Sequence, residues 1–174
     1  MKKLLILVPL LLLAASLSFA QVTSVPTTTL TVTVGAEAAI VVGTTPGFSL
    51  STTFAPYTAS TPYTYYIRTS SGGTGNISVK FVNDWSPGGG PSITSSGTTG
   101  DYLSFTPSVT SPGTAAGKSN CAALNNAYPV ATFVGSASSA IGGNTGSVAW
   151  SLVNDPAYAQ GSYSITATFT ISAS

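Results

Sequence analysis

Residues 162–173 read SYSITATFTISA, and in this stretch apolar side chains occupy every second position. Successive side chains of a β-strand leave opposite faces, so this alternation predicts a strand with one face on a core and the other in water. The stretch carries no charge, and an uncharged strand at the edge of a sheet readily pairs with another chain. We therefore predict that this strand either pairs on both sides or itself forms an assembly surface.

The same two-residue period recurs upstream, between stretches rich in Gly, Pro, Ser and Thr that are typical of turns. Only the run over 120–128 is compatible with a helical turn, and no repeat of fixed spacing indicates a propeller or a solenoid. About eight or nine short strands separated in this way predict one all-β domain over 21–174, an antiparallel Greek-key immunoglobulin-like β-sandwich. We expect the strands upstream of the last one over 29–34, 38–42, 48–54, 63–69, 76–82, 102–106, 128–134 and 147–153, with turns over 70–75, 86–100, 107–117 and 142–146.

Residues 1–20 have the composition of a secretory signal peptide. Lys2 and Lys3 precede an apolar run, and Ser18 and Ala20 place small residues at the −3 and −1 positions of a cleavage site. The run is shorter than the roughly 20 apolar residues that span a membrane, and no basic flank follows it. We therefore expect cleavage after Ala20, no membrane span after cleavage, and a secreted protein that is extracellular or at the cell surface, with the periplasm as the alternative.

The composition narrows the range of activities. The chain has no His and one Cys, so it lacks the usual proton shuttle at neutral pH and cannot build a thiolate zinc site or an internal disulfide. It has 5 Lys and Arg against 4 Asp and Glu, which leaves no basic surface for a phosphate backbone. These counts disfavour most enzyme classes and a nucleic-acid partner, and they predict neither a cofactor nor a metal.

A sequence resemblance lies in the last part of the chain. It is carried by Trp150-Ser151-Leu152-Val153-Asn154-Asp155-Pro156, then Tyr158, then Gly161-Ser162-Tyr163 before the long alternating strand. This order resembles the final hairpin of secreted bacterial immunoglobulin-like and fimbrial-subunit domains. The resemblance implies a sandwich fold, an exported protein and a tyrosine corner at Tyr163, in which the phenol bonds backbone near the turn. The chain departs from the pattern because no second Cys bridges the sheets and Trp150 comes late in the sequence.

A group of aromatic residues is the leading candidate for ligand contact, because exposed rings give sugar-binding modules and protein interfaces contact area at low entropy cost. Packing in the core or under a loop is favoured over ligand contact for this group. Arg68 shares a strand face with Tyr66 and is expected to stack on its ring. The alternative is a carbohydrate platform formed by Tyr66 and Trp85 with the loop over 86–100. The group comprises Tyr57, Tyr63, Tyr65, Tyr66 and Trp85.

Four acids and one thiol remain as candidates for chemistry. Asp84, Asp101 and Asp155 stand beside turn residues, where Asp commonly bonds its own backbone. Two carboxylates within about 5 to 10 Å would allow glycoside hydrolysis, and several converging oxygens would make a calcium site. Turn stabilisation is favoured over both. Cys121 has apolar neighbours, which favours burial over an intermolecular disulfide. The acids are Glu37, Asp84, Asp101 and Asp155.

Together these observations predict an exported, non-enzymatic structural or surface protein, a fimbria-like subunit that assembles with copies of itself or with other envelope proteins. The segment over 21–34 indicates the means, because it begins rich in Thr and ends in an alternating strand. Such a strand pairs in its own sheet or is donated to the edge of a neighbour's sheet, and the first option is favoured. The alternative function is a secreted module that binds a glycan or another ligand.

Overall fold

The computed structural model describes residues 29–45, 47–50, 52–94 and 103–174. The predicted signal peptide lies outside the described residues, as do Asp101 and part of the glycine-rich loop. The chain divides into two compact units, Met1–Thr33 and Val34–Ser174. Every strand of the described residues belongs to the second unit, whereas the described residues of the first unit, 29–33, are exposed and belong to no strand.

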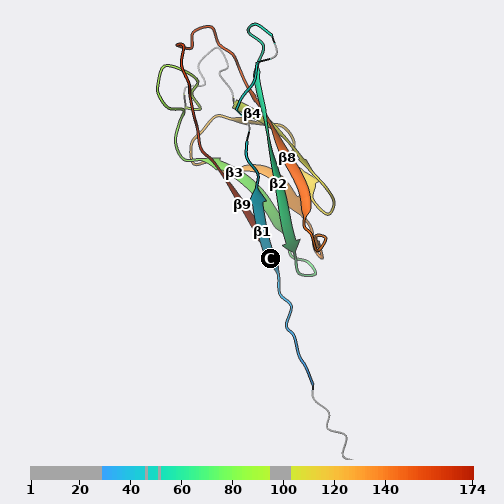
Figure 1. Ribbon diagram of the computed structural model, residues 1–174. Coiled ribbons are helices and arrows are strands. Elements are labelled where there is room, and N and C mark those ends of the chain that lie inside the picture. The colour runs from blue at the N-terminus through green and yellow to red at the C-terminus, as the bar shows by residue number, and fades with distance from the viewer. Residues whose placement is uncertain (1–28, 46, 51, 95–102) are drawn as a thin grey trace, which may run out of the picture. The chain divides into compact units, whose positions relative to one another are not determined.

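The described residues form nine strands in two antiparallel sheets, and none of them forms a helix (Figure 1). This confirms the predicted all-β sandwich, while the Greek-key connection order stays a prediction. The five-stranded sheet has the order β1 (Glu37–Val42), β2 (Tyr57–Arg68), β8 (Asn144–Leu152), β4 (Leu103–Val109) and β6 (Ser119–Cys121). The four-stranded sheet has the order β5 (Thr114–Ala115), β7 (Tyr128–Phe133), β3 (Gly75–Phe81) and β9 (Ala167–Ala173).

The core lies between the sheets and consists of the inward rows of the central strands. Ile77, Val79 and Phe81 of β3 are at most 1% exposed, as the two-residue period of this segment predicts. Trp150 of β8 lies among other rings, with centroid distances of 6.0 Å to Phe81 and 5.3 Å to Phe105. Both contacts are edge-to-face, the geometry that aromatic pairs prefer.

One face of the aromatic strand β2 is buried, as expected. Tyr63 and Tyr65 are 3% and 0% exposed, and their hydroxyls donate to the carbonyl oxygens of Ser108 and Thr110 at 3.1 and 2.6 Å. Burial, and to a smaller extent the neighbouring Tyr65, raises the pKa of Tyr63 to about 12. The two rings are therefore core residues whose polar ends are satisfied by the backbone.

Two predicted strands do not form. The segment over 29–34 belongs to no strand, and β2 is already paired with β1 on one side and with β8 on the other. The expected strand over 48–54 is reduced to one bridge between Ser49 and Thr58. Phe54 ends the extended backbone there, because its φ of 56° lies in the left-handed region.

The region expected to contain a helical turn also differs. Residues Ser119–Cys121 form β6, which pairs with β4 from Leu103 to Phe105. The chain then turns at Asn125, whose φ of 59° is left-handed and incompatible with a right-handed helix. The apolar run over 120–128 therefore contributes a short strand and a turn.

The last strand begins later than its alternation suggests. Strand β9 starts at Ala167, while Ser164 makes an isolated bridge to Ser86 in the loop after β3. Among the described residues β9 pairs with β3 alone. The first option of the prediction, pairing on both sides, therefore does not hold for the described residues, and the second option, an assembly surface, stays a prediction.

Candidate functional site

An edge strand of each sheet lies on the same side of the sandwich. β1 is the edge of the five-stranded sheet and β9 the edge of the four-stranded sheet, and Figure 1 shows them side by side, in contact. No ladder joins the two within the described part of the chain, so each presents backbone groups that no strand pairs. Their inward side chains line what we call the β1–β9 slot: Ala38 and Ile40 of β1 with Ala167, Phe169 and Ile171 of β9.

The slot is incompletely covered. Phe169 and Ile171 are partly exposed, whereas Val79 and Ile77, their register partners on β3, are fully buried. The difference arises because β3 has a strand on each side and β9 has one on a single side. The sandwich therefore leaves apolar surface partly exposed at this edge.

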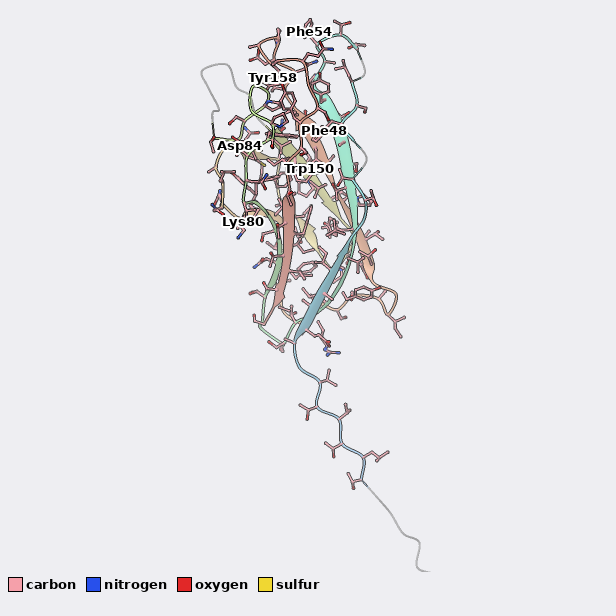
Figure 2. The ribbon with its side chains drawn as sticks, turned by 60° about the vertical axis from the view of Figure 1, so that its left-hand side comes forward. Phe48, Phe54, Lys80, Asp84, Trp150 and Tyr158 are labelled. Atoms are coloured by element: carbon pink, nitrogen blue, oxygen red, sulfur yellow. The ribbon has the colours of Figure 1, made fainter. Side chains whose placement is uncertain are left out.

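A cavity of about 350 Å³ lies where β1 ends and β9 begins. Phe48 and Trp150, both labelled in Figure 2, are among its walls. Val42 contributes from the end of β1, and Ala167 and Phe169 contribute from β9. None of the described residues that line the cavity carries a charge.

The cavity has one polar corner. The indole Nε1 of Trp150 donates to Thr61 Oγ1 at 2.7 Å, and Thr61 Oγ1 lies 2.6 Å from Thr45 Oγ1. Thr61 is 2% exposed, whereas Thr45 is exposed. This short hydrogen-bonded chain satisfies the buried indole and ends in a hydroxyl that water or a ligand can reach.

A second exposed apolar surface lies in the segment over 29–34. Leu30, Val32 and Val34 are 92%, 82% and 60% exposed, and a threonine separates each from the next. In an extended conformation the three apolar side chains would share one face. The chain thus carries an uncovered apolar row at its N-terminal side and, on the sandwich, partly exposed apolar side chains in the β1–β9 slot.

The Asp84 carboxylate organises the loop that follows β3. Its Oδ1 accepts from the backbone N–H groups of Trp85 and Ile93 at 2.9 and 2.7 Å. Its Oδ2 accepts from the hydroxyls of Ser92 and Thr94 at 2.5 and 3.0 Å. Burial by itself raises the pKa of Asp84, but these hydrogen bonds outweigh burial and lower the pKa below its ordinary value of 3.8. Asp84 therefore holds its own loop, as the turn interpretation predicts.

Replacing Asp84 by Asn is expected to lower the free energy of unfolding by about 1 kcal/mol at pH 7, since the amide nitrogen cannot accept a hydroxyl proton. The partial exposure of the side chain limits the loss. The folded-state pKa of Asp84 lies below its unfolded-state pKa, so the carboxylate stabilises the fold at pH values above the unfolded-state pKa. This stabilisation is lost as the pH falls through the folded-state pKa. Urea denaturation at pH 7 and near pH 2 measures the difference, which should shrink at low pH.

The matched control for this substitution is Asp155→Asn. Asp155 Oδ1 accepts from the N–H of Ala157 at 2.7 Å, and the side-chain oxygen of Asn can accept the same bond. We expect little change in its urea midpoint at either pH. If Asp84→Asn at pH 7 unfolded at the wild-type urea concentration, the anchoring role of Asp84 would be wrong.

The Asp84 loop in turn holds the segment that leads into β9. The Tyr163 hydroxyl donates to the carbonyl of Ala159 at 2.6 Å, the kind of contact that a tyrosine corner makes. Its ring lies over Gly90, where a Cβ would approach the ring to 2.4 Å. The N–H of Ala159 donates to the carbonyl of Gly89 at 2.8 Å. Tyr163 therefore joins the segment before β9 to the glycine-rich loop.

The structure does not bring Tyr66 and Trp85 together as a platform. Tyr66 is 38% exposed on the outward face of β2, whereas Trp85 is 8% exposed and packs edge-to-face on Phe48 at 5.9 Å. Arg68 forms an ion pair with Glu37 at 3.0 Å, and its Nε donates to a backbone carbonyl, in place of the expected stacking on Tyr66. Part of the loop over 86–100, assigned to the same platform, lies outside the described residues.

Cys121 is the next candidate from the sequence, and it is buried. Cys121 is 1% exposed, and burial raises the pKa of its thiol to about 12, so the reactive thiolate is scarce at neutral pH.

The last acidic candidate, Asp101, lies outside the described residues. Within the described ranges no three or more Cys, Asp or Glu side chains gather as a metal site would require. In the same part of the chain no helix has the length and hydropathy needed to cross a membrane.

The alternation of the last strand predicted an assembly surface there as one of two options, but neither the slot nor the cavity was predicted from the sequence. Both are formed by segments far apart in the chain, so no local sequence pattern predicts them. Comparisons with family models, curated proteins and solved structures found no match. The fold and the geometry of the slot therefore carry the functional argument.

Proposed function

We propose that this protein is an exported, non-enzymatic structural subunit that assembles with copies of itself by strand donation. In this proposal the segment over 29–34 of one copy lies in the β1–β9 slot of the next. The observation that carries the proposal is the match between two uncovered surfaces: the alternating row at Leu30, Val32 and Val34 and the open apolar slot.

The physical basis is strand addition. A strand that joins the edge of β9 supplies backbone hydrogen bonds along its length and side chains that enter pockets at every second residue. Two residues of a strand span about 6.8 Å, so the spacing of the donated row equals that of Ala167, Phe169 and Ile171 on β9. Each Leu or Val side chain that becomes fully buried contributes about 1.5–3 kcal/mol.

The donated segment and the slot are different surfaces of the same chain. A contact between unlike surfaces is heterologous, and repeated without closure it generates a filament rather than a closed dimer. A filament of this kind at the cell surface or outside the cell agrees with the predicted signal peptide and with a surface that carries few charges. Polymers of one chain are therefore the expected product, and a fimbria-like role follows from them.

The experiment compares two triple variants of the exported protein by light scattering behind a sizing column. The donor-deficient variant carries Leu30→Ser, Val32→Ser and Val34→Ser, which remove the apolar row. We expect polymers from the wild type and a monomer from this variant, because the buried apolar contacts are lost. Added reductant should change neither result, since Cys121 is buried.

The matched control replaces the interleaved threonines at 29, 31 and 33 by Ser and leaves the apolar row intact. It should polymerise like the wild type. Polymers from the donor-deficient variant would exclude this segment as the donor. A wild-type protein that stayed monomeric would overturn the proposal and favour the ligand-binding alternative.

A further inference from the structure

The cavity beside Phe48 and Trp150 has the features of a small-molecule site. Its volume of about 350 Å³ falls within the range of roughly 300–1,000 Å³ that is typical of ligand pockets. We propose that it binds a small uncharged molecule that carries aromatic rings and one hydroxyl group. The proposal rests on the cavity alone and does not depend on strand donation.

The size of the cavity sets the size of the ligand. An apolar protein cavity of about 150 Å³ is large enough for benzene. The present cavity, at about 350 Å³, is more than twice as large and therefore accommodates two fused rings. Val42 and Thr45, two of its lining residues, are exposed, which provides an entry path from solvent.

The walls favour aromatic rings. Phe48, Phe81, Trp150 and Phe169 all line the cavity, and ring pairs gain from edge-to-face and offset contacts in addition to the burial of apolar area. Phe48 is itself held by its edge-to-face contact with the buried Trp85. The site is therefore built on side chains that the core keeps in place.

The charge of the lining sets the charge of the ligand. None of the described lining residues is Asp, Glu, Lys or Arg, so an ionised ligand would lose its hydration without gaining an ion partner. The single hydroxyl group of the ligand is placed at the polar corner formed by Thr61 and Thr45. Thr61 Oγ1 already accepts from Trp150 and pairs with Thr45, while Thr45 Oγ1 retains a lone pair at the mouth and can accept from a ligand hydroxyl.

The test uses 2-naphthol and naphthalene as probes in equilibrium dialysis against the donor-deficient variant, in which a donated strand does not compete for the slot. We expect saturable binding of 2-naphthol at one site per chain. Ala167→Leu adds three carbon atoms inside the cavity and should weaken binding about tenfold or more, because the added atoms overlap the ligand. Thr168→Leu is the control, since residue 168 lies on the outward face of β9.

The hydroxyl contact has its own test. Thr45→Val should weaken 2-naphthol binding about fivefold, the equivalent of one hydrogen bond, and leave naphthalene binding unchanged. Circular dichroism checks that each variant is folded. Non-saturable binding up to the solubility limit, or equal affinity of the wild-type and Ala167→Leu cavities, would overturn the proposal. Saturable binding by the donor-deficient variant supports it whether or not the wild-type chain polymerises, so the two proposals can fail separately.

Discussion

Trp150→Ala should lower the free energy of unfolding by about 3–5 kcal/mol, a large part of the stability of a domain of this size. Trp150 lies near the C-terminal end of β8, is 5% exposed, and packs on the rings of Phe81 and Phe105. Its loss leaves a cavity and also removes the donor of the hydrogen bond to Thr61. Urea denaturation followed by circular dichroism measures the change.

Two further substitutions separate the causes of this loss. Trp150→Phe retains a ring and removes the indole N–H, so it should cost less than Trp150→Ala and fall at about 1–3 kcal/mol. Ala149→Ser changes the residue before Trp150, which is exposed on the outer face of the sheet, and should leave the urea midpoint nearly unchanged. A Trp150→Ala protein with a wild-type midpoint would show that the core is not centred on this ring.

The second large effect is the recovery of assembly on mixing two variants that are each monomeric. The slot-deficient variant is Ala38→Asp, which places a carboxylate in the slot. That carboxylate stays solvated in the monomer because residue 38 is partly exposed, but a donated strand would bury it without a partner. When this variant is mixed with the donor-deficient variant, the intact donor of one meets the intact slot of the other. We expect one-to-one heterodimers and no longer species, measured by light scattering behind a sizing column.

The control for the slot is Ala39→Asp, one residue along β1 and exposed on the opposite face. It should polymerise like the wild type, because its carboxylate stays in water when the slot is filled. Heterodimers in the mixture would assign donor and slot to different copies. Long polymers from Ala38→Asp alone would mean that the donated strand binds elsewhere.

The two-residue period predicted much of the sheet content because it reports how side chains divide between the core and water. It succeeded for β3, β8 and β9, whose apolar residues alternate and face inward. The same signal failed at Leu30, Val32 and Val34, which alternate as regularly as β9 and yet lie exposed. Alternation expresses the tendency to occupy a strand with one buried face, and it carries no information on whether the chain offers an unpaired edge to receive that strand.

The candidate site was harder to predict because its parts are distant in sequence. Trp85 stands among Asn, Asp, Ser, Pro and Gly residues, which indicates an exposed loop, yet it is buried on Phe48 from a loop 37 residues upstream. Thr61 and Trp150 are separated by 89 positions, and their hydrogen bond forms one corner of the cavity. By contrast, the partners of Asp84 lie within ten residues of it, so a turn role was accessible to local reasoning.

The register of β9 on β3 affects how a filament formed by the proposed strand donation would resist mechanical force. Seven residue pairs, from Gly75 with Ala173 to Phe81 with Ala167, join the two strands without a register shift. A strand donated to the other edge of β9 would run along the same axis as β9 and β3, in either direction. Tension that pulls the donated strand along this axis would then act in the direction of the strands. In that geometry the backbone hydrogen bonds are loaded together, in shear, rather than opened one after another from an end. If the proposed assembly occurs, the strand that accepts the donor would also give the filament its tensile strength.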